Sequence, residues 1–240
     1  MSQNLPNMLE GTFAKIREMV DVNSVIGDPI TLPEGETVIY ALAVGDNGLA
    51  SPLVISGYTI GGVVELVSFA DPAMEAAMRQ AIGADENDAI YTNGLWDVKT
   101  FTIPADAQTY TDLAYLPYLE SLHVSNSAKG ELVNVKSLSS LTELVVIDAS
   151  LDDQELLAIG QLSGLKRLTL SDCGISTIAS LSHMNQLVYL DLSKNTIRNL
   201  SVIADMQELE ELYLNNNAVI DLTDLATLTK LKVLDVSYNS

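Results

Sequence analysis

The chain has 240 residues, a formal net charge of −20 and a pI near 4.1. Because such a negative field repels phosphate backbones, nucleic acid is excluded as an expected partner. Cys173 is the single cysteine, so a disulfide within the chain is excluded as well.

The segment 1–68 predicts a small α+β unit. Apolar residues recur at helical spacing over 6–20, which predicts a helix, and strand patterns follow at 37–44, 52–56 and 59–68. The uncharged stretch Ala50–Val64 is shorter than the ~18 residues of a membrane-spanning helix. It therefore predicts two strands around a turn at Ser56 and Gly57, and no membrane span.

One segment of this unit has a family resemblance. Ile16–Ile30, followed by Pro33-Glu34-Gly35, resembles the opening of the GerW/YtfJ family of small bacterial proteins associated with sporulation. The resemblance covers Met8–Val44 and brings no functional residues with it. It implies a sporulation-related N-terminal unit.

Residues 69–97 predict a helix with a signal at each end. Asp71 suits the N-cap, Pro72 the first helical position and Gly83 the C-terminal stop. The segment from Phe69 to Arg79 resembles the helical cap that precedes the first repeat of internalin-like bacterial leucine-rich repeat proteins. We expect such a cap to cover a leucine layer that water would otherwise reach.

Residues 98–240 carry an internal repeat. After a degenerate first copy at Val98, the pattern L-x-x-L-x-L returns at equal steps, except for one longer step between Leu141 and Leu165. The period falls in the range of about 20–29 residues that is typical of a solenoid of stacked coils. The full copies begin at Leu119, Leu141, Leu165, Leu187, Leu209 and Leu231.

Pattern, period and cap together resemble the bacterial, SDS22-like class of leucine-rich repeats. The resemblance implies an α/β fold, a right-handed solenoid of about seven parallel strands on a concave sheet. 3₁₀ turns and short helices are expected on its convex side. The longer step predicts a true α-helical turn near 151–159.

An asparagine occupies the ninth position of three repeats, at Asn195, Asn217 and Asn239. In the family that resembles this chain, it bonds to backbone groups of its own and neighbouring loops, which is what an amide side chain can do for buried turns. Cys173 takes the same position, and we interpret it as a small buried substitute and not as a reactive thiol.

The side chains between the repeated leucines are expected on the concave face, because strand residues alternate in direction. Seven strands about 4.8 Å apart give a face about 29 Å long, which suits a helix, an extended peptide or a domain edge. Tyrosine is enriched among binding hot spots. The candidate partner-binding residues are Arg167, Tyr189, Asp191, Glu211 and Tyr213. The alternative is a solvated face with ordinary cross-strand charge pairs.

No catalytic or metal-binding constellation is evident in the sequence. The only histidines, His123 and His183, fall on the concave and convex sides two coils apart, so they cannot share a metal. Neither can reach an inward-facing Cys173. We therefore expect a non-enzymatic protein without cofactor or metal.

The predicted function is binding of a protein partner through the concave face, in a bacterium. Two alternatives stay open: a structural or oligomerising scaffold for the N-terminal unit, and adhesion or recognition at the cell surface. The start of the chain lacks a signal-peptide pattern, which favours the cytoplasm, although the cell surface stays possible.

The end of the sequence adds one expectation. The chain stops after the strand of its last repeat, which leaves that leucine layer uncapped. This predicts end-to-end self-association, unless the sequence is a fragment of a longer protein.

Overall fold

The computed structural model describes residues 35–41, 54–60, 64–125 and 129–240. The chain divides into two compact units, Met1–Val63 and Val64–Ser240. The helix predicted at 6–20, and most of the segment that resembles the GerW/YtfJ family, lie outside the described residues.

The described part of the first unit is a pair of antiparallel strands, β1 (Gly35–Ala41) and β2 (Val54–Ile60). The turn predicted at Ser56 and Gly57 is wrong, because both residues lie inside β2. Gly57 pairs with Val38, and the pairing continues without a break from Val54 to Ile60. A glycine weakens a strand but does not end it when its neighbours on both sides are paired.

The second unit begins with a short extended segment. The Val67 amide donates to the Ile90 carbonyl at 2.8 Å, and Leu66 forms an isolated antiparallel bridge with Tyr91. Residues 64–68, predicted as the end of a strand in the first unit, therefore belong to the second.

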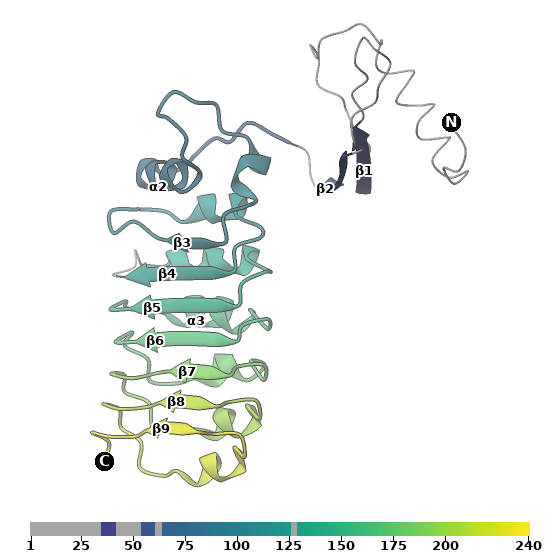
Figure 1. Cartoon of the computed structure of the whole chain (residues 1–240). Helices are drawn as coiled ribbons and strands as arrows, with labels where there is room; N and C mark the ends of the chain where they lie inside the picture. The colour runs from purple at the N-terminus through teal and green to yellow at the C-terminus, as the bar shows by residue number, and fades with distance from the viewer. Residues whose placement is uncertain (1–34, 42–53, 61–63, 126–128) are drawn as a thin grey trace, which may run out of the picture. The chain divides into compact units, whose positions relative to one another are not determined.

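Helix α2 (Pro72–Ile82) forms as its terminal residues predict. The Asp71 side chain accepts bonds from the amides of Ala73 and Met74, and Gly83 ends the helix in the left-handed region at φ 68°. Met74 and Met78 are fully buried and belong to the same apolar core as the repeated leucines. The helix therefore covers the apolar layer at the start of the array, as Figure 1 shows.

A parallel sheet of seven strands follows, in sequence order, so that each coil adds one strand beside the previous one (Figure 1). This confirms the predicted solenoid and its number of strands. The strands are β3 (Thr100–Thr102), β4 (Ser121–Ser125), β5 (Glu143–Ile147), β6 (Arg167–Ser171), β7 (Tyr189–Asp191), β8 (Glu211–Tyr213) and β9 (Val233–Asp235).

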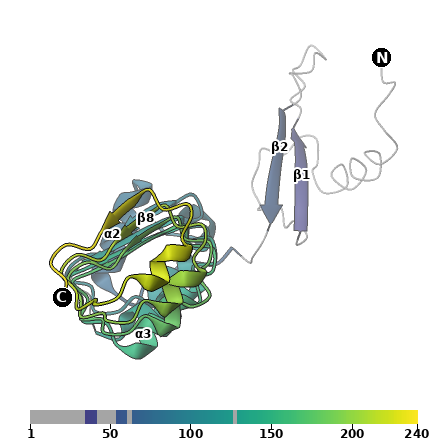
Figure 2. The same ribbon diagram turned by 90° about the horizontal axis from the view of Figure 1, so that it is seen from below.

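The return segments are 3₁₀ turns in every coil but one. Figure 2, which looks along the stack, shows the sheet on one side and these segments on the other. The exception is α3 (Asp153–Gly160), at the place where the longer repeat step predicts a helix, and its Asp152 and Glu155 form a capping box. After η1 (Thr92–Leu95) in the cap, the 3₁₀ turns are η2 (Thr111–Tyr115), η3 (Glu131–Ser137), η4 (Ala179–Leu181), η5 (Ser201–Asp205) and η6 (Thr223–Thr227).

The core lies between the sheet and these return segments. Leu144, Leu168, Leu190 and Leu212 pair in register on successive strands and have no exposed surface. In the last coil, by contrast, Leu234 is 42% exposed. The end-to-end association expected of that layer stays a prediction.

Three buried carboxylates, Asp71, Asp112 and Glu155, join the cap to the first coil and one early coil to the next. Asp112 accepts the amides of Ala70 and Asp71, and Glu155 accepts the amide of Leu132 at 3.1 Å. Asp71 also accepts the amides of Gln108 and Thr109. Each bond satisfies a backbone donor that faces no carbonyl, in coils that lack the repeat asparagine. In this part of the array, acidic side chains thus act as acceptors for buried backbone amides.

Candidate functional site

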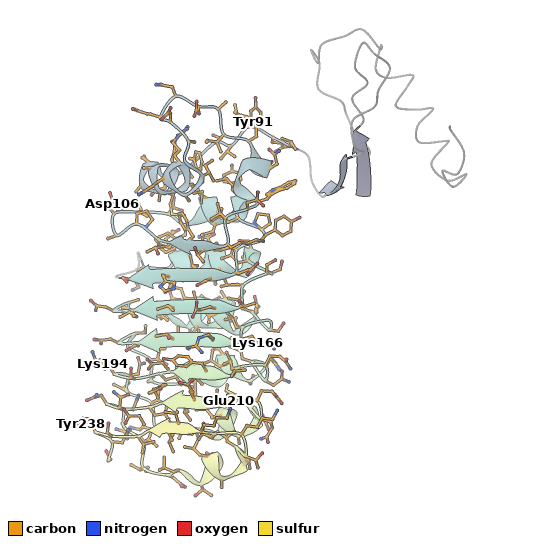
Figure 3. The ribbon with its side chains drawn as sticks, in the orientation of Figure 1. Tyr91, Asp106, Lys166, Lys194, Glu210 and Tyr238 are labelled. Carbon is orange, nitrogen blue, oxygen red and sulfur yellow. The ribbon has the colours of Figure 1, made fainter. Side chains whose placement is uncertain are left out.

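The register of the strands places two rows of side chains across the exposed side of the sheet. Figure 3 draws the side chains of the solenoid as sticks on its ribbon. The first row is Ser121, Glu143, Arg167, Tyr189 and Glu211, each paired in register with the next. The second row lies two residues further along each strand and consists of His123, Val145, Thr169, Asp191 and Tyr213. Between the rows, the repeated leucines point into the core.

A stack of planar side chains crosses three strands of this face. The Arg167 guanidinium lies over the Tyr189 ring, 4.1 Å from its centroid. The Tyr189 and Tyr213 centroids are 5.5 Å apart with an interplanar angle of 44°. The stack thus joins β6, β7 and β8, and each member restricts its neighbour's rotamers.

The Arg167 end of the stack is fixed by a carboxylate. Arg167 Nε lies 3.3 Å from Glu143 Oε1, and the Ser121 hydroxyl donates to Glu143 Oε2 at 2.7 Å. Both partners of the ion pair are partly exposed, so we assign it a positioning effect and little stability.

The Tyr213 end of the stack is held by Glu211, whose Oε2 accepts the Tyr213 hydroxyl at 3.0 Å. This bond, followed by partial burial and the Glu211 charge, raises the pKa of Tyr213. Burial and then the charge of Asp191 raise the pKa of Tyr189, against the opposing effects of Thr169 and Arg167. Both hydroxyls therefore stay protonated near neutral pH, in negative surroundings.

The structure brings the five candidate residues together. Arg167, Tyr189 and Tyr213 form the stack, Glu211 bonds to Tyr213, and the Asp191 Oδ1 accepts the Ser193 amide at 2.8 Å. Whether they bind a partner stays a prediction.

Two contributors were missed. Glu143 pairs with Arg167, and Thr169 is one of the groups that lower the pKa of Tyr189 against the raising effect of burial. The repeat pattern would have found Glu143, because it precedes Arg167 by the same interval that separates Leu141 from Leu165.

A pocket lies at the other end of the same face. It has a volume of about 320 Å³ and is lined by Thr100, Phe101, Thr102, Ser121, His123 and Glu143. The short side chains of β3 and β4 leave this space, which the sequence did not suggest. Glu143 separates the pocket from the stack, so the two features share one wall.

The asparagine position of the repeat has a structural role below this face. Asn195 Oδ1 accepts the amides of Cys173 and Ile175, and its Nδ2 donates to three backbone carbonyls. Asn217 and Asn239 each accept one amide of the preceding coil. These bonds close the turns at the ends of the strands.

Cys173 lies in the same position with no exposed surface, and its Sγ contacts the carbonyls of Val146 and Ser171. Burial, with a smaller effect of nearby aspartates, raises its pKa to about 12. The thiol therefore stays protonated at neutral pH, which disfavours reactivity.

The described residues offer little for other chemistry. Among them, no three His, Cys, Asp or Glu side chains gather closely enough to hold a metal ion. The same part of the chain contains no helix long and apolar enough to cross a membrane.

Comparison with known proteins identifies the fold family. A family model described as leucine rich repeat matches residues 163–219. The crystal structure of internalin C2 from Listeria monocytogenes aligns with 72% of this chain and 76% of its own, at 30% identity and a TM-score of 0.65. The chain belongs to the leucine-rich repeat family.

Other leucine-rich repeat structures align less closely. An internalin, internalin F, also from Listeria monocytogenes, shares 18% identity over 72% of this chain and 70% of its own, with a TM-score of 0.43. A leucine-rich repeat protein from Leptospira interrogans shares 24% sequence identity, with a TM-score of 0.47. The alignment covers 54% of this chain and 34% of the Leptospira chain. A search of the curated proteins finds no match.

The comparisons support the leucine-rich repeat resemblance and not the one to the GerW/YtfJ family, so no sporulation role is drawn from it. Leucine-rich repeat solenoids commonly present an extended surface to a protein.

Proposed function

We propose that this leucine-rich repeat protein binds a protein partner through the concave face of its sheet, without catalysing a reaction. The observation that supports this most directly is the stack of Arg167, Tyr189 and Tyr213 on three successive strands. A solvated face needs no such arrangement, because single charges on each strand would keep it soluble.

The stack has the composition of a binding hot spot, since arginine and tyrosine are enriched in such clusters. It is also ordered before binding, through the Glu143–Arg167 contact and the Tyr213–Glu211 bond. Side chains that are already fixed lose less entropy when a partner arrives, about 0.5–1.5 kcal/mol less for each one.

The test is quantitative affinity capture from an extract of the source organism, with the double variant Tyr189→Ala/Tyr213→Ala. We expect proteins captured by the wild type to be lost or reduced at least tenfold. The matched control is Tyr91→Ala/Tyr238→Ala, which removes two exposed tyrosines that lie outside the two rows of the concave face. Equal capture by the concave variant and the wild type would contradict the proposal.

A second experiment separates binding by the repeats from a scaffold role for them. Val64–Ser240 is a compact unit with its own cap helix and core. We expect it to retain the captured proteins after residues 1–63 are removed. Loss of capture in this fragment, with its thermal transition intact, would favour the scaffold alternative.

A further inference from the structure

The concave face contains a block of four side chains in which tyrosines and carboxylates alternate. Tyr189 pairs in register with Glu211, and Asp191 pairs in register with Tyr213. Neighbouring strands are about 5 Å apart and residues i and i+2 about 7 Å apart, so the four side chains rise from one small area. All four are half-buried.

The carboxylates of this block differ from others along the same sheet. Glu120, Glu143 and Glu210 each pair with a cation of the chain, at 3.4, 3.3 and 2.7 Å. Among the described residues, no lysine or arginine forms an ion pair with Asp191 or Glu211. Asp235, one coil further, likewise has none in that part of the chain. Two neighbouring half-buried anions repel one another, so a cation brought by a partner would relieve this repulsion.

The same face shows how a cation is held in such surroundings. Arg167 lies between the Glu143 carboxylate and the Tyr189 ring. The Glu211 carboxylate and the Tyr213 ring also lie together, on β8, where the Tyr213 hydroxyl donates to the carboxylate. No arginine or lysine of the described residues forms an ion pair with that carboxylate. Burial raises the pKa of Tyr189 and the hydrogen bond to Glu211 raises the pKa of Tyr213, and the charges of Asp191 and Glu211 add to both shifts.

We propose that Asp191 and Glu211, with the rings of Tyr189 and Tyr213, receive a lysine or arginine side chain from a segment of the protein partner. This rests on the proposed function, whose binding face it uses, and it names the chemistry of the occupant. The carboxylates supply charge-assisted hydrogen bonds, and the aromatic rings supply cation–π attraction. The formal charge of −20 steers a basic segment towards the protein.

The probe is a library of short random peptides displayed on phage and selected on the full-length chain. We expect the enriched peptides to share a lysine or arginine at one position. The affinity of the enriched peptides is then measured for Asp191→Asn/Glu211→Gln, which keeps the shape and the acceptor oxygens that bond to Ser193 and Tyr213. We expect this variant to weaken binding about tenfold to a hundredfold.

The matched control is Glu120→Gln/Glu208→Gln, which removes two negative charges whose carboxylates already pair with lysines. We expect it to change affinity less than threefold. The weakening in the Asp191/Glu211 variant then reflects the block itself and not the net charge. Binding should also fall steeply between low and high salt.

The outcomes separate the two proposals. Peptides that need Tyr189 and Tyr213 but carry no basic residue would overturn the cation site and leave the concave face in place. Binding that survives Tyr189→Ala/Tyr213→Ala would contradict the concave face itself. Failure to enrich any peptide would overturn a linear basic segment as the occupant. Binding to an array of neutral glycans, lost in the tyrosine variant and kept in the charge variant, would identify a sugar as the occupant in place of a basic segment.

Discussion

Gly160 makes a close contact that explains why the longer repeat can carry an α-helix. It is the last residue of α3 and is buried. A Cβ added there would lie 2.0 Å from the carbonyl oxygen of Ser180 and 2.9 Å from its carbon. Ordinary carbon–oxygen contacts are about 3.3 Å or longer, so the Gly160→Ala variant must move two backbones apart by about 1 Å.

Helix propensity and packing predict opposite effects of this substitution on the free energy of unfolding. Alanine is favoured over glycine inside a helix by about 1 kcal/mol. Overpacking of a tight interior costs about 1–3 kcal/mol and sometimes more, and a backbone oxygen cannot rotate away as a side chain can. We therefore take the upper end of that cost, about 3 kcal/mol, and expect a net loss of about 2 kcal/mol in the free energy of unfolding. For a unit of this size, that lowers Tm by about 4–8 °C.

The assay is thermal unfolding followed by circular dichroism, with Gly164→Ala as control. A Cβ at Gly164 would meet only the Leu141 carbonyl oxygen, at an ordinary 3.7 Å. That variant should change the stability by no more than about 0.5 kcal/mol. A Gly160→Ala protein as stable as the wild type, or more so, would refute the contact as the reason for glycine at this position.

Three further predictions concern the turns and the cap. Asn195→Ala leaves the buried amides of Cys173 and Ile175 without an acceptor, and should cost about 2–5 kcal/mol in urea unfolding. Asn217→Ala, which frees one amide, should cost less, and equal losses would contradict this reason. Lys194 is exposed and lies in the left-handed region at φ 57°, which glycine adopts without strain. Lys194→Gly should therefore raise the free energy of unfolding by about 0.5–1 kcal/mol. A loss of stability would show that the backbone is not strained there. Burial alone would raise the pKa of Asp71, but hydrogen bonds from four backbone amides lower that pKa below its usual 3.8. The stability that the Asp71 carboxylate contributes is therefore complete above pH 3.8, and it is lost as the pH falls through the folded-state pKa. Asp71→Asn should therefore flatten the dependence of stability on pH below about 4, and an unchanged slope would contradict this assignment.

The parts of the fold that depend on periodic burial could be predicted from the sequence. Leu144, Leu168 and Leu190 stack because each repeat brings its leucine to the same place in the coil. The ends of α2 could also be predicted, since Asp71 and Gly83 act through hydrogen bonds to residues near them in the chain. Local capping and a fixed period need no knowledge of distant contacts.

Other parts could not be predicted, because they depend on contacts between distant residues. The Ala70 amide donates to Asp112 and the Leu132 amide donates to Glu155, but neither bond recurs from one repeat to the next. Acidic residues are also seldom expected in a core. The turn at Ser56 and Gly57 was mistaken because a glycine favours a turn locally, whereas pairing along the whole of β2 decided the outcome. The pocket beside His123 depends on the absence of bulk on β3, which no single motif records.

The concave face lies between these cases, because the repeat fixes its geometry without fixing its chemistry. Tyr189 follows Arg167 by one repeat, so their adjacency follows from the period alone. That Arg167 lies flat on the Tyr189 ring, while Asp191 and Glu211 lack any cation of the described chain, depends on which rotamers and pairs form. Because each exposed position can change without disturbing the leucines beneath it, the same solenoid can present different chemistries. In this chain, the unpaired charge is therefore a property of the face itself, and not a requirement of the fold.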